Sequence, residues 1–141
     1  MRLDRSAHRT RETGLTRGSS LRDLARYTLA GIRLFNGTIA LVAPGTLAQR
    51  LGVKPEAAPA AAYVLRMFGV RTVLIGLDLL LLEGDDLDRA LRNGVVIHAS
   101  DTLAAATAGV TGQLPATPAA TATAISTVNV LLALTARGRR A

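Results

Sequence analysis

Four charged side chains and one histidine interrupt long apolar stretches of the sequence, where they could exchange protons or pair with one another. Arg71 and Asp78 are seven residues apart, so they would lie on nearly one face of a helix, and His98 and Asp101, three residues apart, would share a face of another. Charged groups in such stretches are costly unless they are paired or line a cavity. With an asparagine and a further arginine on the same stretches, the candidate polar cluster consists of Arg33, Asn36, Arg66, Arg71, Asp78, His98 and Asp101.

Two kinds of chemistry are open to the carboxylates. Asp101 or Asp78 could serve as a general acid or base, with His98 able to titrate beside them. Alternatively, Asp101 forms an ion pair with Arg71 or Arg33. We expect this pairing, because a helical rise of ~1.5 Å per residue brings Asp101 within ~4 Å of the level of both arginines on adjacent antiparallel helices.

Neither a metal ion nor a cofactor is expected. The spacing of His98 and Asp101 resembles a pair of metal ligands, but the sequence has no cysteine and only one other histidine, so His and Cys do not complete a ligand set. A dinucleotide site would need a glycine-rich turn after a strand, and no segment alternates apolar and polar residues as a strand does.

Four apolar segments must position these side chains, and they predict an all-α protein, a bundle of four transmembrane helices. The segments cover about residues 27–48, 60–82, 93–112 and 119–136, each close to the ~20 residues that cross a bilayer. Residues 102–136 contain no Asp, Glu, Lys or Arg, whereas a soluble amphipathic helix carries charge on its wet face. Pro44 and Gly45 should end or kink the first helix. A soluble helical bundle is the competing interpretation, since the last two segments are rich in Ala, Thr and Gly.

The distribution of basic residues predicts the orientation. Twelve of the 17 Lys and Arg residues lie before the first segment, in the polar loop 83–92 or at the C-terminus, and only Arg50 and Lys54 lie on the opposite side. Cytoplasmic loops of membrane proteins carry such an excess of positive charge. We therefore expect a multi-pass protein of the cell membrane with both termini in the cytoplasm.

The ends of the chain are interpreted on the same basis. Residues 1–20 are expected to form a disordered, Arg-rich cytoplasmic arm, followed by one transmembrane domain over 21–141.

The net charge of +7 usually suggests nucleic acid as a partner, but aromatic residues make up only 3% and there is no Trp to stack on bases. The expected partners are membrane lipids, an apolar small molecule or a partner membrane helix, and a second copy of the chain, rather than nucleic acid.

The order of three motifs resembles a family of small bacterial and fungal four-helix membrane proteins of unknown function. The first apolar segment closes on Ala-Pro-Gly-Thr-Leu-Ala-Gln-Arg-Leu-Gly (43–52), the second carries the pattern Arg66-x-x-Gly69-x-Arg71-x-x-x-x-Gly76, and the third bears Asp101. The resemblance covers about residues 27–136 and implies the four-helix topology without implying an activity. Asp78 and His98 fall outside the shared pattern.

Three functions are compatible with this sequence. The leading hypothesis is a binding or accessory protein whose polar cluster holds the head group of a lipid-like ligand or a partner helix. The alternative is a membrane-embedded isomerase or cyclase in which Asp101 or Asp78 transfers protons to and from an apolar substrate. A proton-coupled carrier is a weaker hypothesis, because four helices would have to dimerise to form one.

Overall fold

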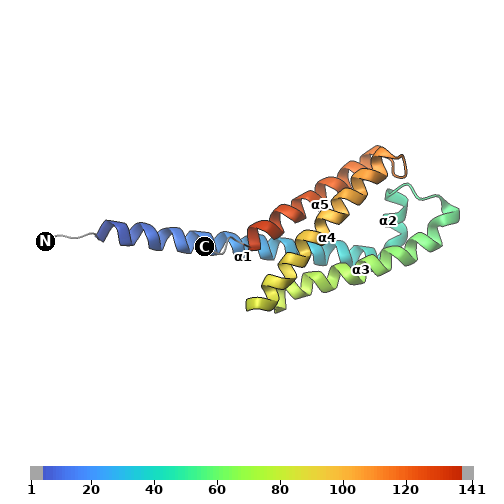
Figure 1. Ribbon diagram of the computed structural model, residues 1–141. Coiled ribbons are helices and arrows are strands. Elements are labelled where there is room, and N and C mark those ends of the chain that lie inside the picture. The colour runs from blue at the N-terminus through green and yellow to red at the C-terminus, as the bar shows by residue number, and fades with distance from the viewer. Residues whose placement is uncertain (1–4, 138–141) are drawn as a thin grey trace.

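The computed structural model describes residues 5–137, with side chains described for residues 18–137, and all regular structure in that part of the chain is helical. Two long helices, α1 (Arg5–Val42) and α3 (Ala58–Leu81), are joined by the short helix α2 (Pro44–Arg50) and the 3-10 turn η1 (Pro55–Ala57). Helix α4 (Gly84–Val110) and helix α5 (Ala116–Arg137) follow as a hairpin. Figure 1 shows the α4–α5 hairpin diverging from the α1–α3 pair towards the end that holds α2. The all-α prediction is confirmed.

The first helix differs from its predicted bounds at both ends. It begins at Arg5, so the backbone of most of the segment expected to be a disordered arm is helical here. No proline interrupts residues 5–42, which allows the helix to continue. It ends at Val42 because Pro44 has no backbone N–H to donate, and Pro44 instead opens α2. The predicted break at Pro44 is therefore confirmed.

The polar loop predicted over 83–92 is wrong for most of its length. Helix α4 starts at Gly84, nine residues before the predicted start at Asn93. Gly84 has a φ of +56°, a left-handed conformation that reverses the chain directly after α3 at little cost to glycine. Asp85 and Asp86 then occupy the first turn, where carboxylates stabilise the positive end of a helix. The acidic composition that suggested a loop instead belongs to a helix N-terminus.

Helices α1 and α3 pack with their backbones in near contact. A Cβ on Gly69 would lie 2.8 Å from the carbonyl oxygen of Gly37 and 2.8 Å from Cγ of Leu41, and one on Gly76 would lie 2.9 Å from Cγ of Leu34. Gly69, Gly76 and the buried Thr72 share one face of α3. Small residues on that face let the two helices approach closely.

The α4–α5 hairpin contacts the rest of the bundle at both ends of the molecule. At the end where α3 turns into α4, the buried core consists mainly of small and aliphatic side chains: Ala25, Leu29, Ala30, Leu79, Leu91, Ala133 and Ala136. At the opposite end, the loop after α2 meets the start of α5, where a Cβ on Gly52 would lie 2.9 Å from Cγ of Pro115. Between these ends, α5 packs on α1, while α3 contacts α4 over only a short stretch.

Arg26 joins α1 to the end of α3. Its Nε donates a hydrogen bond to the carbonyl oxygen of Leu79 at 2.5 Å, and its Nη2 donates to that of Leu82 at 2.8 Å. Leu79 lies in the last turn of α3 and Leu82 directly follows the helix, so no further helical N–H reaches these carbonyls. A positive charge here also offsets the negative end of the helix.

One described helix, α5, is long and apolar enough to cross a membrane by length and composition. The other long helices carry more charge: α3, for example, contains Arg66, Arg71 and Asp78. The four-span architecture and the orientation of the termini thus remain predictions.

The packing of α1 on α3 generates a test. We expect Gly69→Ala to lower the free energy of unfolding by about 1–3 kcal/mol, because the added methyl group meets backbone that has to move. Gly31→Ala is the matched control: a Cβ there meets nothing within 4 Å, so the greater helix propensity of alanine should leave stability unchanged or raise it by up to about 1 kcal/mol. Thermal unfolding followed by circular dichroism measures both. Equal stability of the two variants would contradict the close approach.

Candidate functional site

The carboxylate of Asp101 on α4 lies between two arginines from two other helices. Its Oδ1 accepts a hydrogen bond from Nη2 of Arg71 on α3 at 3.1 Å, and its Oδ2 lies 3.7 Å from Nη2 of Arg33 on α1. The ion pairing expected from the sequence is confirmed with both candidate partners. One carboxylate therefore links α1, α3 and α4.

Arg33 also contacts His98, and both side chains are buried. The Nη2 of Arg33 hydrogen-bonds to Nδ1 of His98 and lies 3.2 Å from its Nε2. A guanidinium group can only donate, so the imidazole nitrogen that it meets must accept and carry no proton. Arg33 is 3% exposed and His98 is 0% exposed, so this contact belongs to the interior of the bundle.

Helical periodicity explains how α4 presents these groups inward. Its buried residues, Leu91, Gly94 and His98, recur at three- and four-residue intervals, and Asp101 continues the same face one turn later. The hydroxyl of Thr102 donates to the carbonyl oxygen of His98 at 2.8 Å, so it needs no partner from another helix. His98 and Asp101, at the polar end of this face, therefore lie at the height along the bundle where Arg33 extends from α1.

Arg71 reaches the cluster from the edge of α3 rather than from its buried face. Its neighbour Thr72 is fully buried, whereas the Arg71 side chain is 50% exposed and that of Asp101 is 23% exposed. The guanidinium carbon of Arg71 also lies 5.8 Å from the ring centroid of Phe68, one turn earlier, within the range of a cation–π contact. Arg71 thus spans the boundary between the cluster and the surface.

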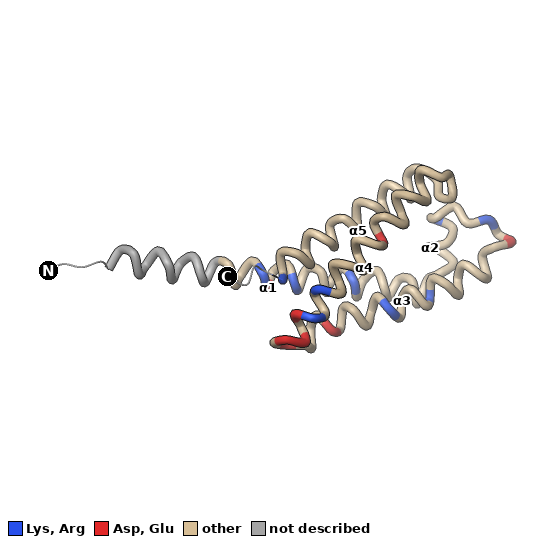
Figure 2. Tube along the Cα trace, in the orientation of Figure 1, with Lys and Arg blue, Asp and Glu red and all other residues tan. Residues whose placement is uncertain are grey.

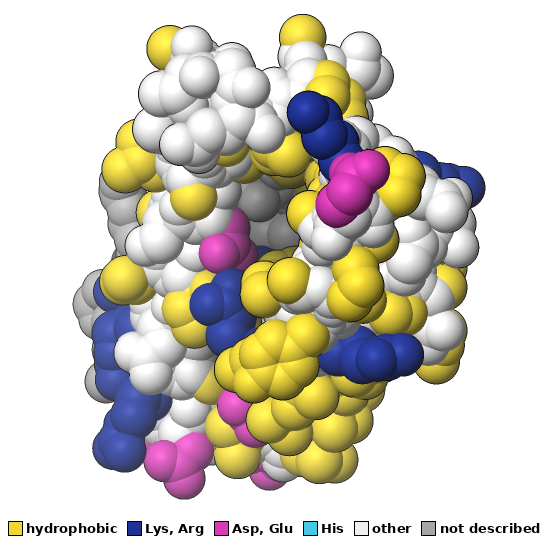
Figure 3. Space-filling view, turned by 90° about the vertical axis from the view of Figure 1, so that its right-hand side faces the viewer, with side chains coloured by type: hydrophobic (Ala, Val, Ile, Leu, Met, Phe, Trp, Pro, Cys, Tyr) yellow, Lys and Arg dark blue, Asp and Glu magenta, His cyan; other side chains and the backbone are white. Residues whose placement is uncertain are grey.

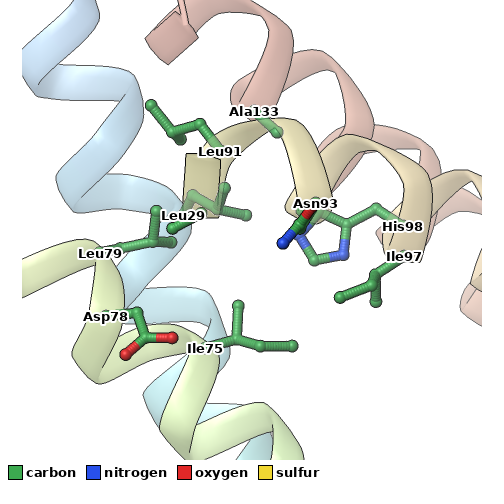
Figure 4. Close-up of a pocket in the computed structure, with 11 residues that line it drawn as sticks. Leu29, Ile75, Asp78, Leu79, Leu91, Asn93, Ile97, His98 and Ala133 are labelled. Atoms are coloured by element: carbon green, nitrogen blue, oxygen red, sulfur yellow. The ribbon is translucent and has the colours of Figure 1, made fainter. Parts of the chain in front are cut away.

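A cavity of about 140 Å³ adjoins the cluster (Figure 4). Asp78 and His98 both line it, on α3 and α4, together with aliphatic side chains such as Leu29 and Ile75. In the described part of the chain, the Asp78 carboxylate forms no ion pair with either cluster arginine. Asp78 is therefore a cavity-lining residue beside the cluster. The prediction that it belongs to the cluster is correct for its position near His98, but not for pairing with Arg33 or Arg71.

The other two predicted site residues lie apart. Arg66 is exposed on α3, five residues before Arg71 and turned well away from it around the helix. Asn36 is half-buried on α1 and lines a separate groove of about 360 Å³ with apolar residues of α1 and α5 that include Phe35 and Ile125. The structure brings together Arg33, Arg71, His98 and Asp101.

Two further buried polar residues lie outside the predicted cluster. Thr72 on α3 is 0% exposed and Asn129 on α5 is 1% exposed. Within the described residues, Thr72 Oγ1, Asn129 Oδ1 and Arg33 Nε are buried without a hydrogen-bond partner. An asparagine in the middle of an uncharged helix was the available signal for Asn129. Thr72, one of many threonines, gave none.

The arrangement can bind charge. No group of three or more His, Cys, Asp or Glu residues in the described part of the chain is placed to hold a metal ion. Two guanidinium groups face one carboxylate, which leaves the cluster with donors for a further anion.

Comparisons with protein-family models, with curated proteins and with solved structures found no match to this chain. The resemblance to small four-helix membrane proteins therefore remains a prediction. Of the residues that carry it, Gly69 and Gly76 contact α1 and Arg71 pairs with Asp101, while Arg66 faces outwards.

The three arginines should differ in their effect on stability. We expect Arg33→Leu to be the most destabilising, by about 3–5 kcal/mol, because it leaves the buried His98 without its hydrogen-bond donor and removes one of the two arginines that pair with Asp101. Arg71→Leu should cost less, since Arg71 is half-exposed, and Arg66→Leu should cost least because Arg66 has no carboxylate partner among the described residues. Unfolding of the three purified variants in one mild detergent gives the order. If Arg66→Leu is as harmful as Arg33→Leu, the cluster does not stabilise the bundle.

Proposed function

We propose that this chain is an integral membrane protein whose four long helices cross the bilayer, with both termini cytoplasmic, and that its Arg–Asp–His cluster binds the head group of a lipid-like ligand. One observation carries the proposal. Among the described residues, four polar or charged side chains (Arg33, Thr72, His98 and Asn129) are buried inside, while many large apolar side chains are exposed on the outside.

The exposed apolar residues occur on every long helix. Phe35 on α1 is 67% exposed and Val110 on α4 is 90% exposed, while Tyr63 on α3 and Leu131 on α5 are exposed as well. Figure 3 shows such side chains spread over one end of the molecule, around a hollow with acidic and basic side chains at its edge. Soluble proteins rarely expose so much contiguous apolar surface, whereas lipid-facing helices do.

Helix lengths and charge placement fit a bilayer. Helices α3, α4 and α5 have 24, 27 and 22 residues, and at ~1.5 Å per residue each exceeds the ~30 Å of hydrocarbon. Charged residues gather around the α3–α4 turn and around η1, at opposite ends of the molecule (Figure 2). The few that remain between these ends include the paired Arg33, Arg71 and Asp101, which is how membrane interiors accommodate charge.

The cluster's composition favours a binding role over a purely structural one. Arg71 is half-exposed and meets the carboxylate through only one of its nitrogens. A guanidinium group has five N–H donors, so Arg71 retains donors for a ligand or for a polar group on a partner helix. The molecule that co-purifies with the protein in mild detergent, identified by mass spectrometry, would distinguish a ligand from a partner protein.

One observation favours the alternative function, an isomerase or cyclase. Asp78 and His98 face the same cavity of about 140 Å³, so a general acid and a general base could act on one apolar molecule there. Asp101 is the weaker candidate for proton transfer, because both of its oxygens are engaged by arginines. Loss of a chemical conversion on Asp78→Asn would favour this alternative.

Topology provides the direct test. The sequence has no cysteine, so single cysteines can be introduced without a background. In intact cells, we expect a membrane-impermeant maleimide to label Lys54→Cys and Gln113→Cys, but to label Ser20→Cys and Asp86→Cys only after permeabilisation. The reason is the excess of positive charge on the cytoplasmic side. External labelling of Asp86→Cys, or recovery of the chain in the soluble fraction without detergent, would overturn the four-span proposal.

A further inference from the structure

We infer that the ligand of the cluster is an anionic amphiphile, a carboxylate or phosphate on an apolar tail, and that Arg71 binds its anionic group. This inference deepens the proposed function and depends on it.

The charges around Asp101 do not balance. Two guanidinium groups, those of Arg33 and Arg71, share one carboxylate. His98 accepts a hydrogen bond from Arg33 and brings no negative charge. Asp78, on the other side of the adjoining cavity, forms no ion pair with either arginine in the described part of the chain. One positive charge is therefore left without a compensating carboxylate.

Of the two arginines, Arg71 is the one that an incoming anion can reach. The Arg33 side chain is 4% exposed, and its Nη2 is already divided between His98 and Asp101. The Arg71 side chain is 50% exposed and has one carboxylate contact, through Nη2. Its planar group can still present two parallel N–H donors to a carboxylate or phosphate.

The surface beside Arg71 is suited to an apolar tail. Met67 and Leu74 are exposed, and their spacing of four and three residues from Arg71 puts them on the same face of α3 as Arg71. Arg71 lies ten residues from Leu81 at the end of α3, about 15 Å along the helix axis, so it would sit near the middle of the bilayer. An uncompensated charge at that depth is costly, and an anion that brings its own apolar tail removes the cost.

The test uses a matched pair of probes, dansylated undecanoic acid and its methyl ester, with the full chain in phosphatidylcholine nanodiscs. We expect the carboxylate to bind at least about tenfold more tightly than the ester, the value of one charge-assisted contact. Arg71→Gln should abolish this preference and leave ester binding unchanged, which also shows that the variant is folded. Arg66→Gln removes the same charge from the same helix at an exposed site outside the cluster, and should keep the preference.

A second variant tests the charge argument from the opposite direction. Asp101→Asn removes the carboxylate that competes for Arg71, so it should tighten binding of the acid, whereas a purely structural role for Asp101 predicts weaker binding.

Equal affinity for acid and ester, or equal loss in the Arg66→Gln and Arg71→Gln variants, would overturn the inference. Displacement of the probe by inorganic phosphate as effectively as by dodecyl phosphate would also overturn it, in favour of a free-anion site. If cysteine labelling supports four spans and the acid still shows no preference, only the ligand class is wrong.

Discussion

The bridge from Arg33 through Asp101 to Arg71 is the interaction on which the arrangement of the helices depends. Helices α1 and α3 form one close pair and α4 and α5 another, and α3 contacts α4 over only a short stretch. Asp101 provides α4 with a contact to each helix of the first pair. An ion pair of this kind stabilises a structure only where water is scarce and the geometry is good. The Arg33 end of the bridge, where the side chain is 4% exposed, is shielded from water, whereas the Arg71 end, where the side chain is 50% exposed, lies at the surface.

Small residues make it possible to bury so polar a cluster. Helices α1 and α3 meet backbone to backbone at Gly37 and Gly69, and most of the buried hydrophobic side chains elsewhere are alanines. A soluble bundle needs large apolar side chains inside, because their removal from water drives folding. Here many large apolar side chains face outwards, and the buried hydrophobic residues of the described chain are seven alanines and three leucines. The membrane location that we propose accounts for this distribution, since apolar side chains lose nothing by facing lipid.

The sequence predicted the helices and the central ion pair better than the direction in which each side chain points around its helix axis. Pro44 ends α1 for a reason that is local to the backbone, and Asp101 could be matched with Arg33 and Arg71 from helical rise alone. Asp78 shares a face with Arg71 but lies two turns away, too far for contact, and Arg66 faces away from it. Partner choice between helices depends on how each helix is rotated towards its neighbours. That rotation is fixed by glycine contacts distant in sequence, so a single-helix pattern does not reveal it.

The incomplete satisfaction of the cluster supports the binding role that we propose over a role that merely fixes helix register. A structural network is most stabilising when every donor and acceptor is paired and the charges cancel. In this cluster and on the helices beside it, Arg33 Nε, Thr72 Oγ1 and Asn129 Oδ1 have no partner within the described residues. The surplus positive charge lies on Arg71, the one member that also reaches the surface. Buried polar groups without a partner are costly and uncommon, and a bound molecule that completes the set is one explanation for them. The unpaired groups and the surplus positive charge make this network a weaker stabiliser of the bundle, and they make it suitable as a binding site.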